Sequence, residues 1–189
     1  MQGNYIGTDR TGTVDLGNTD DGIRVFGNDN ILGGSLPGQG NLISGNGMAG
    51  IQIAAGDRNV IRGNLIGTNA RGTGALGNGF TGVWVDGDSD NVIGGHTTAG
   101  EGNVISGNGA GGIRITASFG TGPAAGNLIE GNRIGTDPSG TVSIGNTGAG
   151  ILIESFTGES AAGNTVGGTA PLAGNVIAVQ RRGRSCGDG

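Results

Sequence analysis

The densest group of acidic side chains in the sequence is Asp86-Gly87-Asp88-Ser89-Asp90. An aspartate can act as a general base in catalysis or as a ligand of calcium. The sole tryptophan, Trp84, lies two residues before this group, and an aromatic face of this kind can stack on a sugar ring. An arginine such as Arg114 pairs with carboxylates. These residues predict a carbohydrate site with Asp86, Asp88 and Arg114 as candidate catalytic residues, and a possible calcium site at Asp88 and Asp90.

The elements that would position these residues follow from an internal repeat. The motif Gly-Ile/Val-x-Ile/Val begins at Gly22, Gly50, Gly82, Gly112 and Gly150, so the unit is about 30 residues long. Each interval also holds two short Asn-x-Ile pieces punctuated by glycine and asparagine, which favours three short β-strands joined by turns. Apolar residues pair at i and i+2, so helical periodicity is missing.

A unit of this size cannot bury its own hydrophobic face, whereas stacked units with strands about 4.8 Å apart bury a continuous column. Aligning the units predicts three inward columns and one column of asparagines at a turn. The first two columns are Ile23, Ile51, Val83, Ile113, Ile151 and Val25, Ile53, Val85, Ile115, Ile153; the third is Leu32, Ile61, Ile93, Ile129, Val166; the asparagines are Asn30, Asn59, Asn91, Asn127, Asn164. We therefore predict an all-β fold, a right-handed parallel β-helix (solenoid) of about six coils with three short parallel sheets.

The same alignment predicts which side chains face outward from the Gly-Ile-x-Ile strands. One outward column is Arg24, Gln52, Trp84, Arg114, Leu152, and a second is Phe26, Ala54, Asp86, Thr116, Glu154. From these columns we take Arg24, Gln52, Trp84 and Thr116 as candidate substrate-binding residues. The alternative is an ordinary solvated surface on which an arginine stacks against the tryptophan.

The Gly-Ile-x-Ile and Asn-x-Ile-x-Gly-Asn strings over residues 3–178 resemble those of the pectin-lyase-like right-handed β-helix repeat proteins. That group includes polysaccharide lyases, hydrolases, epimerases, phage tailspikes and plain surface solenoids. In its lyases and hydrolases, Asp and Arg lie on this kind of face. The resemblance implies an extracellular or cell-surface bacterial protein that binds or processes a polysaccharide, and we expect an acidic glycan on the Trp84 face.

Two other functions stay open. One is a non-catalytic structural or adhesive solenoid fragment. The other is a hydrolase or esterase built on His96, the sole histidine, with Ser89 near it in sequence.

Composition excludes several classes. The chain of 189 residues has a formal net charge of -5 and no basic stripe along its repeats, which argues against a nucleic-acid partner. No apolar run approaches the ~20 residues of a membrane span, and the first residues lack the pattern of a signal peptide. The single cysteine, Cys186, excludes an intramolecular disulfide or a cysteine-based zinc site.

The repeat also predicts the domain organisation. We expect residues 1–178 to form one β-helix domain, a fragment of a longer solenoid, and residues 179–189 to be a non-repeat tail. Open solenoid ends expose unpaired strand edges, so homo-oligomers through these ends are expected.

Overall fold

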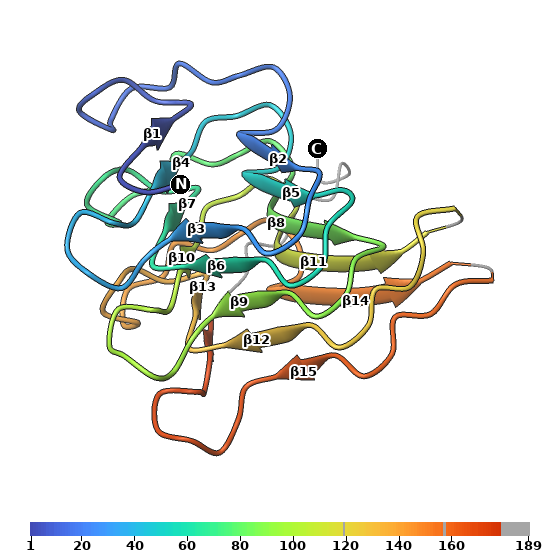
Figure 1. Ribbon diagram of the computed structural model, residues 1–189. Coiled ribbons are helices and arrows are strands. Elements are labelled where there is room, and N and C mark those ends of the chain that lie inside the picture. Colours follow the sequence, from blue (N-terminus) through green and yellow to red (C-terminus); the bar gives the residue numbers. More distant parts are fainter. Residues whose placement is uncertain (119, 157, 179–189) are drawn as a thin grey trace, which may run out of the picture.

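The computed structural model describes residues 1–118, 120–156 and 158–178, and the predicted tail at 179–189 lies outside this part of the chain. The described residues form sixteen short strands and no helix. The strands make three sheets in which all pairs are parallel, and successive strands along the chain visit the three sheets in turn (Figure 1). No segment of this described part is a helix able to cross a membrane.

Each sheet takes one strand from each coil. The first sheet contains β1 (Tyr5–Ile6), β4 (Leu42–Ile43), β7 (Leu65–Ile66), β10 (Val104–Ile105), β13 (Arg133–Ile134) and β16 (Val176–Ile177). The second sheet contains β2 (Ile23–Val25), β5 (Ile51–Ile53), β8 (Thr81–Asp86), β11 (Gly111–Ala117) and β14 (Ile151–Ser155). The third contains β3 (Ile31–Gly33), β6 (Val60–Arg62), β9 (Val92–Gly94), β12 (Leu128–Glu130) and β15 (Thr165–Val166). The described residues thus make five complete coils and begin a sixth, as the repeat predicted.

The three predicted inward columns are confirmed by the strand register. Ile113 pairs with Val83 on one side and with Ile151 on the other, and Ile129 lies between Ile93 and Val166. Branched aliphatic side chains suit this interior because each one packs on a near copy of itself in the next coil. The columns merge into one buried core.

The predicted asparagine column is also confirmed, and two further columns occupy the other corners of the coil. In each, the backbone N–H and the side-chain Nδ2 of one asparagine donate to Oδ1 of the asparagine in the following coil, as Asn59 does to Asn91 at 2.8 and 3.1 Å. The additional columns are Asn4, Asn41, Asn64, Asn103, Asn132, Asn175 before the first sheet and Asn18, Asn46, Asn78, Asn108, Asn146 before the second. These ladders satisfy polar groups that would otherwise be buried without partners at the turns.

Candidate functional site

The outer face of the second sheet carries a group that we call the Trp84 cluster: Phe80, Trp84, Arg114 and Glu154. The parallel pairing of β8 with β11 puts Arg114 directly beside Trp84 in the next coil. The Phe80 and Trp84 rings meet edge to face with centroids 5.6 Å apart. The Arg114 guanidinium carbon lies 5.5 Å from the Phe80 centroid and 5.7 Å from the Trp84 centroid. The predicted contact between arginine and tryptophan is therefore present, and the stacked cation fixes both rings.

Glu154 holds Arg114 in this position. Arg114 Nε donates to Glu154 Oε1 at 2.7 Å, across the pairing of β11 with β14. The arginine is thus placed by groups from three successive coils: Trp84 on β8, its own strand β11, and Glu154 on β14.

A small depression of about 80 Å³ adjoins the cluster. It exists because the coil that follows Phe80 and Thr81 carries Ala110 and Gly111 at the matching places, where larger side chains would fill the space. Thr81 is one of its lining residues, and the Thr81 hydroxyl is buried with no hydrogen-bond partner in the described part of the chain.

Two of the predicted binding residues point outward in the register but are largely covered. Gln52 is 6% exposed and Thr116 is 1% exposed, so little of either side chain is accessible, and their role in binding stays a prediction. Gln52 lies between Arg24 and Trp84 in the register, and Arg24 Nε donates to its Oε1 at 2.8 Å. Because neighbouring coils are only about 4.8 Å apart, larger neighbours above and below cover a medium-sized side chain.

Arg24, the remaining predicted binding residue, lies at the N-terminal end of the same outward column. It forms ion pairs with Asp20 at 3.2 Å and with Asp21 at 2.6 Å. The structure thus places Trp84 and Arg114 together and leaves Arg24 two coils away from Trp84.

The three aspartates of the acidic segment have different surroundings. Asp86 is half-buried on the outer face, and burial raises its pKa while a hydrogen bond from Ser118 and the charge of Arg114 oppose that rise. Asp88 is only 6% exposed. It occupies a turn position at which other coils carry small residues, Gly56 and the buried Ala124 among them.

Asp88 is bound within the turn. Its Oδ1 accepts a hydrogen bond from the backbone N–H of Gly56 at 2.6 Å, and its Oδ2 is buried with no partner among the described residues. Burial raises the pKa of Asp88 to about 6, and the negative charges of Asp57 and Asp86 add to that rise. A carboxyl group in this position does not reach a ligand on the outer face.

Asp90 lies at a turn position with a left-handed backbone conformation. Its φ of 58° lies in the left-handed region, and the same turn position is held by Asp29 at 61° and by Arg58 at 56°. In later coils glycine takes this place, as at Gly126 with φ of 69°, which is expected because glycine adopts such angles without strain. Among the described residues, no group of three or more His, Cys, Asp or Glu side chains could hold a metal. The calcium site at Asp88 and Asp90 stays a prediction, and no third Asp or Glu of the described residues joins it.

His96 forms a pair with a carboxylate and not with a serine. Its Nδ1 lies 2.6 Å from Glu130 Oε1. Ser89 Oγ instead donates to the carbonyl of Pro123 and accepts from the N–H of Ala125. Because both groups of the suggested dyad are engaged elsewhere, the structure does not assemble the arrangement that an esterase would need.

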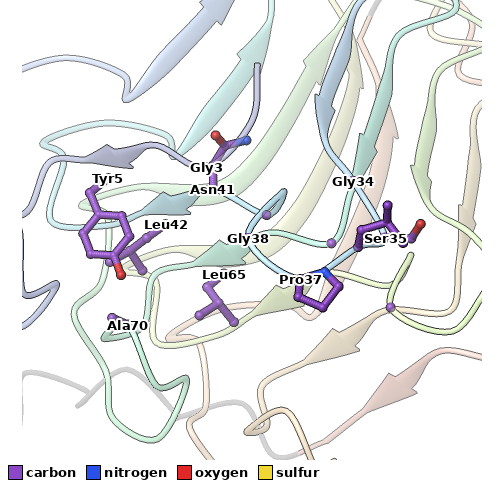
Figure 2. A pocket seen from close by; sticks show the side chains of 14 residues that line it. Gly3, Tyr5, Gly34, Ser35, Pro37, Gly38, Asn41, Leu42, Leu65 and Ala70 are labelled. Atoms are coloured by element: carbon purple, nitrogen blue, oxygen red, sulfur yellow. The ribbon is translucent and has the colours of Figure 1, made fainter.

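Sequence reasoning missed a groove over the outer face of the first sheet. It has a volume of about 490 Å³. Tyr5, Leu42 and Leu65 are in register along β1, β4 and β7, and they lie on one side of the groove with Ala70, while Ser35 and Pro37 lie on the other (Figure 2). The signal was available: the outward neighbours of the predicted Asn-x-Ile strands, together with the glycine-rich insertion at Gly34-Ser35-Leu36-Pro37-Gly38.

The stacked coils and their asparagine corners define a parallel β-helix, and the comparison with protein families assigns it. A family model described as "Right handed beta helix region" matches residues 13–166. The chain belongs to this family. No curated protein and no solved structure matches it significantly.

Proposed function

We propose that this chain is a polysaccharide-binding β-helix domain and that the ligand lies across the Trp84 cluster. One observation carries the proposal: two aromatic rings and a guanidinium, all partly exposed, are held in a fixed arrangement on the outer face of a sheet. Aromatic faces bind the C–H faces of sugar rings, and the remaining N–H groups of Arg114 can donate to sugar hydroxyls.

The shape of the face favours a polymer over a small molecule. Small-molecule sites are usually enclosed pockets of about 300–1,000 Å³, whereas the depression beside the cluster has about 80 Å³. The strands of neighbouring coils continue this face along the solenoid axis. An extended chain of sugars can contact several coils, and we include an extracellular or cell-surface location in the proposal because such polymers are found there.

The environment of the carboxyl groups supports binding over cleavage. Most glycoside hydrolases use two carboxyl groups on either side of the scissile bond. Asp86 borders the cluster, but Asp88 is enclosed in the turn and bonded to Gly56. Processing of the polysaccharide would therefore depend on Asp86 and Arg114 without Asp88.

The proposal is tested by titrating the protein with a panel of soluble polysaccharides and following tryptophan fluorescence. Because Trp84 is the sole tryptophan, any change in emission reports on the cluster. We expect a saturable change with at least one class of glycan, and the same titration with added calcium or a chelator tests the metal prediction. A flat response across the panel would contradict the proposal.

Variants then locate the site. By calorimetry, which does not need the tryptophan, Trp84→Ala is expected to lower the affinity at least about tenfold, as for a central contact residue. Phe26→Ala is the matched control, because Phe26 is a 71% exposed aromatic that directly follows β2, two coils away from β8. Equal losses in both variants would place the ligand elsewhere.

A second candidate is a structural or adhesive solenoid without a glycan site. The observation that favours it is the continuity of the three asparagine ladders, which link each coil to the next. This alternative predicts no response in the titration and no effect of Trp84→Ala beyond a small change in stability.

A further inference from the structure

The cations on the Trp84 face are compensated by carboxylates of the same chain. Arg114 is paired with Glu154, and Arg24, at the end of the same outward column, is paired with Asp20 and Asp21. The other positions of this column are Gln52, Trp84 and Leu152, none of which carries a charge. Both arginines of the column are therefore paired with an acidic side chain.

The pair at the centre of the cluster is also partly shielded from water. The side chains of Arg114 and Glu154 are 23% and 28% exposed. A carboxylate on a ligand would have to compete with Glu154 for the guanidinium or approach a face on which Glu154 and Asp86 are both acidic. Repulsion between the ligand carboxylate and these two acidic side chains disfavours binding, most strongly at low salt.

The charge of the whole solenoid acts in the same direction. Residues 1–178 contain seven arginines and no lysine, against fourteen Asp and Glu side chains. A surplus of negative charge slows the approach of an anionic polymer and lowers its local concentration at the surface.

We propose that the Trp84 cluster selects neutral polysaccharides and discriminates against uronate-containing ones. This inference rests on the proposed function and replaces the acidic glycan expected from the sequence with a neutral one. In the bound state, Arg114 supplies a stacking surface and hydrogen-bond donors for hydroxyl groups. Its positive charge stays paired with Glu154 and is not available to a ligand carboxylate.

The test uses oligosaccharides that differ only in oxidation at C6. Matched β-1,4-linked pairs of glucose and glucuronate, mannose and mannuronate, and an α-1,4-linked pair of galactose and galacturonate cover three stereochemistries. With the full chain at low ionic strength, we expect the neutral member of the binding pair to bind at least about tenfold more tightly. Added salt should narrow the difference by strengthening uronate binding.

The variant Glu154→Gln releases Arg114 without changing the size of the side chain. It should raise the affinity for the uronate member relative to the neutral member by about fivefold or more, so the ratio of the two affinities is the readout. Glu159→Gln is the matched control: it removes one negative charge from the loop after β14, where Glu159 forms no ion pair with Arg114. A general charge effect would be equal in both variants and would overturn the role given to Glu154.

The outcomes distinguish this inference from the proposed function, polysaccharide binding, on which it rests. Tighter binding of the uronate member by the unmodified protein would overturn the preference for neutral glycans and would leave glycan binding standing. No binding of any member, together with a flat response to the wider polysaccharide panel, would overturn both.

Discussion

The residues at the corners of this solenoid repeat from coil to coil, whereas the residues on the outer face of its second sheet do not. At each corner the same residue returns in every coil, so that Asn59, Asn91 and Asn127 each bond to a copy of themselves. On the outer face, neighbouring positions hold Gln52, Trp84 and Arg114, which differ in size, charge and chemistry. A residue whose neighbours are copies of itself is selected by stacking. A position that breaks the repeat is where this fold can acquire a specific partner.

The inner and outer sides of two paired strands, β11 and β14, give the strongest test of this contrast. Ile113 faces the core and is 1% exposed, whereas Leu152, on the next strand, faces outward. Ile113→Asp places a carboxylate in the core without a partner, a cost of several kcal/mol that is comparable with the whole stability of a domain. We expect the variant to lose its cooperative unfolding transition, measured by circular dichroism.

Leu152→Asp is the control for that experiment. It introduces the same carboxylate on the paired strand but on the solvent side, where we expect a change of at most about 1 kcal/mol. If Leu152→Asp unfolded the chain as well, the distinction between the two sides of the strand would be lost.

The asparagine ladders should show a smaller effect that depends on position along the solenoid. Asn91→Ala removes the oxygen that accepts from both the backbone N–H and Nδ2 of Asn59; the buried backbone N–H loses its partner, and Nδ2 keeps only its bond to the carbonyl of Gly56. We expect a loss of about 3 kcal/mol in the free energy of unfolding, measured in urea.

The ladder also contains its own control, because its first member accepts no bond from another asparagine of the described chain. Asn30→Ala removes one side-chain donor to Asn59 and leaves the bond from its backbone N–H at 2.9 Å. We expect a loss of about 1 kcal/mol. Equal losses for Asn30→Ala and Asn91→Ala would show that the ladder contributes no more in the interior than at its end.

The sequence predicts the repeated part of the molecule better than the part that does not repeat. Alternation alone places Ile113 inside and Arg114 outside, because each strand position has copies in the other coils that confirm its direction. Alternation does not predict how much of an outward side chain is exposed to solvent. Gln52 and Thr116 point away from the core and are nevertheless covered by neighbours in adjacent coils.

The ion pairs of the site are harder to predict for a related reason. Arg114 and Glu154 are 40 residues apart in the chain, and their contact depends on the lengths of two loops as well as on the strand register. The groove beside Tyr5 likewise depends on how the insertion at residues 34–38 lies against the first sheet. Repeat alignment fixes the strands but not the inserted segments, and the inserted segments carry much of the surface.

Asp88 breaks the repeat at a buried turn position. It is a charged residue in a column that elsewhere holds small residues, such as Gly56 and Ala124. Its pKa is raised from 3.8 to about 6 in the folded protein, chiefly by burial. The folded state therefore favours the protonated acid. The stability that Asp88 contributes is fully present below about pH 3.8 and is lost as the pH rises through about 6.

Asp88→Asn should remove this dependence because an amide does not titrate, while its Oδ1 can still accept from the N–H of Gly56. Relative to the parent, the variant should gain up to about 3 kcal/mol between pH 3.8 and pH 6, measured by urea unfolding at several pH values. Asp29→Asn is the control of opposite sign: a hydrogen bond from Arg58 lowers the pKa of Asp29, so the parent should lose the advantage of this exposed pair as the pH falls. A difference between parent and Asp88→Asn that did not change with pH would mean that the carboxyl group is hydrated in the folded state. The corner would then tolerate a charge as readily as the outer face does, and the contrast between the two regions would not extend to this turn.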